Sequence, residues 1–560
     1  MIPGANETKR WAELVFPCEV SHNSIDCGFD PPKIEMAEEQ DLPLLMKMVR
    51  IVMVLVVLAL LNLTLITRSS PSLKVEFWVA VLACGGVVGT LMAIYQLILN
   101  ASIDFTWGTI GSLVESSTLG LPLPLVIPPL LLGLTAVCAD RIPNGGASLF
   151  VKSVHHDEQI PLFTSLFGIP LTSIVAITSG GSAGPEGPVL PIGGSIGGWY
   201  WRFVEGSRAR DGSEPDRALS IGDMVLVGGC ASIAAFFDDV IAGCIFVMEV
   251  PHLNGMQRAH VLSASLIACF ASWFAHRILM VPFGIEYSPK MAAMRSSPNL
   301  GFAPAMSFDI VFAVPCGLLA GGMSIAFIKA RQFLDPIAFP SKSYKSPLLR
   351  GMTCGLIVGA FALLRPHSLM WGEAQLDKLS GKTVFDSTDP AFLEFYSNQW
   401  SRQWLYAISL GIVKFITIVV TTTCGYPAGI VFPLIFVGYC VGGGIGASPL
   451  MTTIFGSAYA SVLPQTLGAC LGSGFLAGVM HVPLGTALLG QRMTGCDAHG
   501  FAMLLVCNYI ACFIHARTIF KQENEKVKDY VGPSGPSRLG SGGIMPKEDD
   551  EGLLPVRAHH

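Results

Sequence analysis

Long runs of apolar residues, separated by short polar connectors, recur along almost the whole chain. A helix needs about 20 residues to cross roughly 30 Å of bilayer hydrocarbon. Some runs pass this test, while many are shorter or are interrupted by glycine and proline. The pattern predicts an all-α polytopic membrane protein that mixes full-length helices with broken half-helices. The apolar runs lie at about 51–66, 77–99, 122–139, 160–180, 189–203, 224–249, 259–280, 308–328, 349–364, 404–423, 430–447, 465–490 and 500–516.

The charged residues are concentrated at the two ends of the chain. The first 50 residues carry 14 of them and the last 40 carry 13, whereas the 77 residues from Phe415 to Gln491 carry none. Because a charge at the centre of a bilayer costs about 2.5–3.5 kcal/mol, such a stretch indicates membrane burial. The net charge of −5 leaves no basic surface for a phosphate backbone. We therefore predict an integral multi-pass protein whose surroundings are a lipid bilayer, with no nucleic-acid partner.

These patterns divide the chain into three parts. Residues 1–46 are an acidic, polar arm that we expect in the cytosol, because the first apolar run begins only near Ile51 and the arm lacks the features of a signal peptide. Residues 47–520 form the transmembrane domain. Residues 521–560 have the composition of a flexible tail.

The transmembrane domain contains a weak internal repeat. A Gly/Pro-rich broken segment followed by a Gly/Ala-rich helix pair occurs twice, with the broken segments at 180–198 and 425–446. This order predicts two inverted halves, at about 77–285 and 300–518. Broken helices are tolerated in a membrane only where the freed backbone groups are buried in protein or line a water-filled cavity. The two segments therefore indicate a transport site, although glycine-rich segments also occur simply because they pack closely.

One carboxylate stands alone in the first broken segment. Glu186 is the only charged residue between Glu158 and Arg202, and a lone ionisable group at membrane depth is a functional-site hypothesis by default. Gly184 and Gly187 allow backbone N–H groups to approach an anion. We expect Glu186 at or just before a helix N-terminus, where the helix dipole attracts either its carboxylate or a chloride ion. Protonation of the carboxylate would then free the site for the anion. The alternative is a glutamate paired with a basic residue for folding.

The second broken segment offers a matching site without a charged side chain. The sequence GIVFP at 429–433 follows a glycine-rich break and predicts the start of a helix. Free N–H groups of Ile430 and Val431 could coordinate an anion through partial charges alone, which suits transport because an ion bound too tightly does not leave. We predict that the backbone at Gly184, Gly187, Ile430 and Val431 binds the anion.

No motif indicates an enzyme, a metal centre or a cofactor. Walker loops, nucleophile elbows and zinc motifs do not occur. The 15 cysteines contain no C-x-x-C pair, and we interpret them as small buried hydrophobes. The HHDE sequence at 155–158 has metal-binding residue types, but it lies in a polar connector, where charges are ordinarily solvated. We expect no metal and no cofactor.

Four sequence elements, in this order, resemble the CLC family of chloride channels and transporters. GGSAGPEGPVLPIGGSIGG at 180–198 resembles the family's G-[KR]-E-G-P element, and AAFFDDVIAGCIFVMEV at 234–250 resembles A-x-F-N-A-P-L-A-G-x-x-F-x-x-E. GIVFP resembles G-x-F-x-P, and HVPLGTALLGQRMTG at 481–495 resembles A-P-L-T-G-x-x-x-x-x-E-M-T. The resemblance covers about 80–520.

The resemblance implies a homodimer with one anion pore per subunit, which conducts chloride. Each subunit would have two inverted halves and about 18 helices. Glu186 would be the external gating glutamate, and the backbone at Ile430 and Val431 would line the central chloride site. Only about 40 residues follow Phe520, too few for a CBS domain of the kind that many family members carry there.

The chain departs from the family at the inner proton position. The first carboxylate of F-x-x-E falls on Glu249, and the inner glutamate that relays protons in the antiporters falls on Val250. Family members that behave as channels tend to carry valine there. The substitution favours a channel over an antiporter.

Other departures affect the pore. The family's serine-bearing G-S-G-I-P loop corresponds to NGGAS, which makes Gly145, Gly146 and Ser148 the candidates for an anion-binding loop. The family's pore tyrosine falls on Ala511, and Tyr509, two residues away, is the candidate for that role.

Three substitutions change charge. Arg492 stands at the glutamate of E-M-T, Pro185 replaces the usual basic residue before the gating glutamate, and Asp238-Asp239 replace Asn-Ala. We expect the Asp pair to cap the following helix.

Three functions are open at this point. The first is a passive chloride channel gated by Glu186. The second is a chloride/proton antiporter whose proton route uses Glu249. The third is a weakly conducting or non-conducting membrane subunit that binds a partner through its arm and tail.

Overall fold

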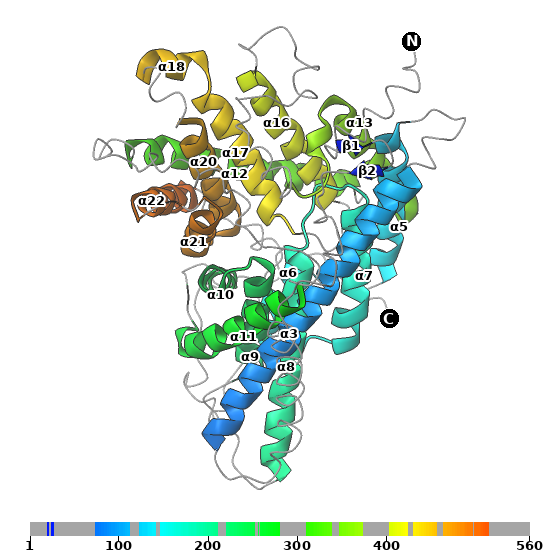
Figure 1. Ribbon diagram of the computed structural model, residues 1–560, viewed down its shortest axis with the longest axis vertical. Helices are drawn as coiled ribbons and strands as arrows, with labels where there is room; N and C mark the ends of the chain where they lie inside the picture. Colours follow the sequence, from blue (N-terminus) through cyan, green and yellow to red (C-terminus); the bar gives the residue numbers. More distant parts are fainter. Residues whose placement is uncertain are drawn as a thin grey trace, which may run out of the picture.

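The computed structural model describes a largely helical chain (Figure 1). The described residues are 19–21, 24–26, 73–111, 122–141, 146–210, 220–251, 256, 258–280, 310–338, 346–372, 403–423, 429–455, 463–494, 496 and 498–514. The apolar run at 51–66, most of the arm and the whole tail lie outside them.

The first half begins with one long helix and continues with shorter ones. Before it, strands β1 (Glu19–Ser21) and β2 (Ser24–Asp26) pair antiparallel. The helical elements are α3 (Leu73–Ile103), η1 (Asp104–Ile110), η2 (Leu123–Leu125), α5 (Ile127–Arg141), α6 (Ala147–His156), η3 (Thr164–Gly168), α7 (Ile169–Thr178), α8 (Glu186–Arg210), α9 (Ile221–Phe236), α10 (Val240–Glu249), η4 (Ala259–Val261) and α11 (Leu262–Met280).

The second half has the same mixture of long and short helices. Its elements are α12 (Ile310–Ala338), α13 (Pro347–Leu364), η8 (Pro366–Ser368), α16 (Gln403–Thr422), α17 (Val431–Gly446), α18 (Pro449–Phe455), α20 (Leu463–Met480), α21 (Pro483–Thr494) and α22 (Ala498–Ile514).

The expected mixture of full-length and half-length membrane helices is confirmed. Within the described part of the chain, six helices are long and apolar enough to cross a membrane, or seven if the bent pair α17–α18 is one span. Five further helical stretches of the described residues, α9 and α10 among them, are apolar but too short to cross alone. The chain is therefore an all-α polytopic membrane protein.

In both halves, the helix that follows the Gly/Pro-rich segment packs closely on a later helix of the same half. In the first half α7 ends, the chain breaks, and α8 packs on α9; in the second half α16 ends and α17 packs on α20 (Figure 1). The approach is close enough that a side chain at Gly193 would overlap the backbone of Gly228, and one at Gly438 would overlap that of Gly472. Small residues at a helix contact allow the backbones to come together in this way.

The two halves share one apolar core. The largest cluster of buried apolar side chains contains Val189 and Val247 from the first half and Phe436 from the second. Helix α5 packs on α13, and α10 packs on α21. The break between α7 and α8 is therefore held against elements that come more than 200 residues later in the sequence.

Candidate functional site

Glu186 begins a helix, as the sequence predicts. Helix α7 ends at Thr178, residues 179–185 form the break, and α8 starts at Glu186. Gly180 adopts a φ of +84°, a left-handed conformation that glycine tolerates without steric cost. The Glu186 side chain is only 2% exposed. The carboxylate of Glu186 therefore lies buried in the first turn of the helix that follows the break.

A pair of backbone hydrogen bonds joins the two broken segments beside this carboxylate. The Gly184 N–H donates to the Gly429 carbonyl, and the Gly429 N–H donates to the Gly184 carbonyl, each at 2.7 Å. A methyl group at Gly184 would overlap the Glu186 carboxylate, and one at Gly429 would overlap both the carboxylate and the Gly184 backbone. Glycine at both positions lets the two loops close around the carboxylate.

The Glu186 carboxylate reaches the N-terminus of α17, a helix of the other half. The backbone N–H of Phe432 donates to Glu186 Oε1 at 3.3 Å. Ile430 is the residue that precedes the helix, and Val431 is its first residue. Backbone N–H groups in the first turn of a helix lack partners within the helix and attract negative charge. A carboxylate of the first half thus lies where the second half offers an anion site.

Aromatic side chains surround one side of this contact. The ring of Phe432 packs edge-on against Phe237, with 5.7 Å between centroids, and Phe237 packs edge-on against Phe246, with 5.8 Å. An apolar, water-poor neighbourhood strengthens electrostatic interactions within it. The rings also connect the contact to α10.

The structure brings together part of the expected backbone site. Gly187 lies in the first turn of α8, and its N–H would be close to any side chain at Gly429. The N–H of Gly184, expected to contact an anion, donates instead to Gly429. Phe432, one position beyond the expected pair Ile430 and Val431, donates its N–H to the carboxylate. The anion-binding roles of these residues stay predictions.

The loop candidates lie at the start of α6. Gly145 is outside the described residues. Gly146 directly precedes the helix, and Ser148 is half-buried in its first turn. The anion-binding role of this loop stays a prediction.

Glu249 reaches a second helix N-terminus. It ends α10 and is 3% exposed. Its carboxylate accepts from the N–H of Gly485 at 2.7 Å and from the N–H of Leu484 at 3.4 Å, both at the start of α21. Val250, at the inner proton position, is fully buried. The carboxylate next to that position is thus a cap for a helix of the other half.

The pore tyrosine candidate faces outward. Tyr509 is 53% exposed, whereas Ala511 is fully buried and lies close to Gly478 of α20. The interior position on α22 is therefore held by the alanine. A pore role for Tyr509 stays a prediction.

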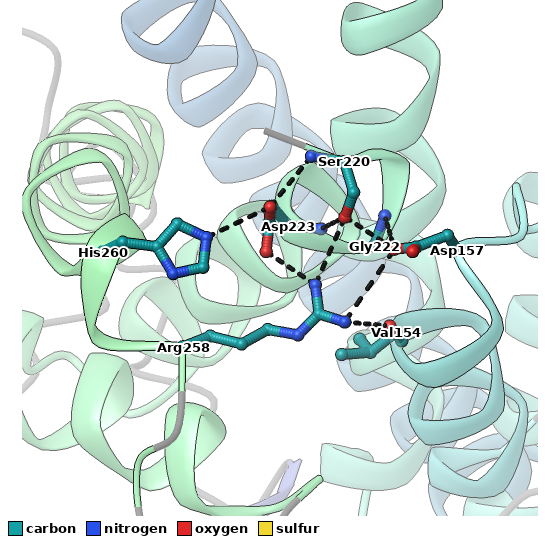
Figure 2. Close-up of polar contacts among 7 residues, drawn as sticks. All are labelled: Val154, Asp157, Ser220, Gly222, Asp223, Arg258 and His260. Carbon is teal, nitrogen blue, oxygen red and sulfur yellow. Dashed lines mark hydrogen bonds and ion pairs between the residues drawn. The ribbon is translucent and has the colours of Figure 1, made fainter. Parts of the chain in front are cut away.

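A polar cluster fixes the ends of α6 and α9 (Figure 2). Buried Arg258 donates to Asp223 at 2.6 Å and to the Val154 carbonyl at 2.7 Å. Ser220 and Asp223 form a reciprocal cap at the start of α9, and Ser220 also donates to Asp157 at 2.6 Å. Asp157, part of the HHDE sequence, is thus engaged in holding helix ends together.

A comparison with known families identifies the chain. The sequence profile of the family described as voltage gated chloride channel matches residues 130–516, more than half of the chain. The chain belongs to this family, the CLC family.

Individual relatives have low sequence identity to the chain, but the alignments with them are long. The chain is 22% identical over 434 residues to chloride channel protein CLC-e of Arabidopsis thaliana, covering 74% of this chain and 56% of the relative. It is 23% identical over 377 residues to human ClC-Ka, covering 60% and 52%. It is 22% identical over 379 residues to the ClC-type chloride channel ClcB of Shigella flexneri, covering 67% and 78%. The chain spans about half the length of the plant CLC-e and the human relative.

Solved CLC structures share the fold. A slow cyanobacterial Cl⁻/H⁺ antiporter superimposes with a TM-score of 0.60 at 17% identity, covering 80% of this chain and 95% of the other. A CLC-type fluoride/proton antiporter superimposes with a TM-score of 0.55 at 18% identity, covering 82% of this chain and all of the other.

Two departures from the CLC pattern meet in space. Arg492 donates to the Asp238 carboxylate at 3.1 Å and to its carbonyl at 3.3 Å, and it lies 3.7 Å from the Asp239 carboxylate. Asp238 is also held by Arg277 and Trp273. Asp239 caps α10 as expected, because its side chain accepts from the N–H of Ala242. The arginine in place of glutamate and the aspartates in place of Asn-Ala are thus in direct contact.

Sequence reasoning missed two groups near the break. One is the Phe432 N–H. The other is Lys414, a fully buried lysine of α16 that directly precedes the charge-free stretch starting at Phe415. Its isolation between apolar residues was the available signal, since an ionisable residue inside a membrane span is expensive and marks function.

Proposed function

We propose that the chain conducts chloride across a membrane and that Glu186 gates the path between the N-termini of α8 and α17. The observation that carries the proposal is the hydrogen bond from the Phe432 N–H to the Glu186 carboxylate. An ionised carboxylate at this helix terminus occupies a position that favours an anion. The two negative charges compete for it, so the path is blocked while the carboxylate stays.

Protonation opens the path in this mechanism. A protonated Glu186 carries no charge, so its attraction to the start of α17 weakens. The side chain can then leave, and chloride takes its place next to the N–H groups of the first turn. Partial charges alone hold the ion there, which permits release. External acid should therefore activate anion flux.

A passive channel is the version we favour. Val250 cannot carry a proton, and the carboxylate of Glu249 is engaged by two N–H groups of α21. The alternative is a chloride/proton antiporter, which has support from the antiporters among the related structures. In that case Glu249 is the nearest inner relay, and Glu249→Gln abolishes proton coupling while sparing chloride flux.

The test is chloride efflux from liposomes that contain the purified protein, with external pH recorded in the same cuvette. A channel releases chloride without proton movement, and an antiporter takes up protons in fixed ratio. Absence of flux under any condition would support the non-conducting subunit, in which case a stable partner should copurify. We expect the flux-competent unit to be a homodimer, which the mass of the reconstituted particle measures.

The gating role of Glu186 has its own test. Glu186→Ala should conduct at neutral pH and lose most of its response to external acid. Glu158→Gln is the matched control, because Glu158 is an exposed carboxylate at the end of α6. A Glu186→Ala protein that keeps the wild-type acid response would show that the gate lies elsewhere.

A further inference from the structure

Helix α16 carries a polar stripe inside an apolar span. Thr417 and Thr421 lie three and seven residues after Lys414, so the three side chains share one face of the helix. Lys414 lies midway along the membrane span Trp404–Thr422 and is fully buried. A lysine at this depth is costly and has to be explained by what it contacts.

The lysine is bound by a short segment that follows α13. Its Nζ donates to the carbonyls of Ser368 at 2.9 Å, Leu369 at 3.3 Å and Met370 at short range. An ammonium group has three N–H donors, whereas a neutral amine has two. The three carbonyls therefore match the three N–H donors of the ammonium form. No Asp or Glu within the described part of the chain pairs with it, so its positive charge is not cancelled locally.

The same segment holds the loop that leads to Glu186. Ser182 Oγ donates to the Ser368 carbonyl at 2.8 Å and lies 2.8 Å from Thr417 Oγ1. The Ser182 N–H donates to Thr421 Oγ1 at 3.2 Å. The Met370 N–H donates to the Gly180 carbonyl at 3.0 Å. The loop at 179–185 is thus tied to the lysine-bound segment and to the stripe of α16.

The amine also lies against an aromatic side chain of α17. Lys414 Nζ is 5.5 Å from the ring centroid of Phe436. Phe436 is four residues, about 6 Å of helix rise, beyond Phe432, whose N–H contacts the Glu186 carboxylate. Pro185 stands directly before Glu186, at the position where the CLC motif usually has a basic residue.

We propose that Lys414 is a positioning residue for the gate: it clamps the loop that carries Glu186 and, in its ammonium form, supplies a positive charge to the anion path. The inference rests on the proposed function. A nearby cation favours the ionised carboxylate and bound chloride alike. Removing it should make Glu186 easier to protonate and should weaken chloride binding.

The test compares Lys414→Gln with Lys414→Arg in liposomes. Glutamine keeps two N–H donors for the carbonyls without charge, and arginine keeps the charge. For Lys414→Gln we expect the pH of half-maximal flux to rise by about 0.5–1 unit and the half-saturating chloride concentration to rise about three- to tenfold. Lys414→Arg should stay near wild type in both. Wild-type values for a folded Lys414→Gln would overturn the proposal.

Two further variants separate the possible failures. Ser182→Ala removes a loop contact without changing charge. It should raise chloride flux at neutral pH and leave the half-saturating chloride concentration unchanged. A wild-type flux in Ser182→Ala would contradict the clamp, even if Lys414→Gln does not fold. In a Glu186→Gln background, chloride flux should no longer depend on external pH. Adding Lys414→Gln to that background should still weaken chloride binding. If Glu186→Gln keeps its acid response, the proposed gate fails, and chloride half-saturation alone then decides the role of Lys414.

Discussion

Two buried glutamates of the first half, Glu186 and Glu249, each contact the N-terminus of a helix of the second half, but they are held differently. The Glu249 carboxylate is bound at 2.7 Å by Gly485 and is contacted by a second N–H of the same helix turn. The bond from Phe432 to Glu186 is 3.3 Å. The same electrostatic device therefore caps the start of α21 in one place and meets the first turn of α17 in the other.

The surroundings strengthen this contrast. Helix α21, capped by Glu249, is fastened again near its other end, where Arg492 binds Asp238 beside the start of α10. The loops around Glu186 meet through the reciprocal bonds of Gly184 and Gly429. Two contacts hold α10 against α21, whereas glycines line the carboxylate of Glu186.

The largest expected effect comes from filling the space beside Glu186. A methyl group at Gly184 would overlap the Glu186 carboxylate, which supplies its three nearest atoms. Since overpacking costs about 1–3 kcal/mol, Gly184→Ala should displace the carboxylate and raise chloride flux at neutral pH about tenfold or more. Liposome efflux at pH 7.5 and pH 5 measures the ratio. Gly322→Ala in α12 is the matched control, because nothing lies near that position; an unchanged pH response in Gly184→Ala would refute the close fit.

The second effect is on stability rather than flux. Glu249→Ala removes the acceptor for two N–H groups of α21 and should lower the free energy of unfolding by about 1–3 kcal/mol. Thermal unfolding in detergent measures the loss. Glu249→Gln keeps one acceptor oxygen and should lose less. If Glu249 is only a cap, both variants should keep the wild-type activation of chloride flux by external acid. If the wild-type protein carries protons and Glu249→Gln abolishes that proton flux, Glu249 is a proton relay instead.

The surroundings of Glu186 could be predicted from the sequence in part. The lone carboxylate of GPEGP and its glycines predicted the break and the helix start at Glu186, because both follow from local chemistry. The contact between Gly184 and Gly429 was not readable locally, since the two residues are distant in the chain and meet only through tertiary packing. The donor at Phe432 depended on where α17 starts, and helix boundaries are uncertain by a residue or two in sequence reasoning.

The pore tyrosine shows a second limit. Tyr509 and Ala511 are two positions apart on α22, so they point about 200° apart around the helix. Only one of them can face the interior, and the buried residue is Ala511. A shift of two positions therefore exchanges one face of a helix for the other. Sequence similarity located the helix but did not fix which of its faces lines a pore, and the pore role of Tyr509 stays a prediction.

The smallest expected effect tests the second contact of α21. Arg492 is about a third exposed, and Asp238 keeps Arg277 and Trp273 without it, so Arg492→Met should cost less than about 1 kcal/mol. Arg492→Glu should cost more, because it places a carboxylate beside Asp238 and Asp239. Thermal unfolding of the double-mutant cycle with Asp238→Asn measures the coupling. If the two departures from the CLC pattern compensate each other, Asp238→Asn should recover most of the stability that Arg492→Glu loses. If the stability losses of the two single variants add in the double variant, the arginine and the aspartates are independent of each other.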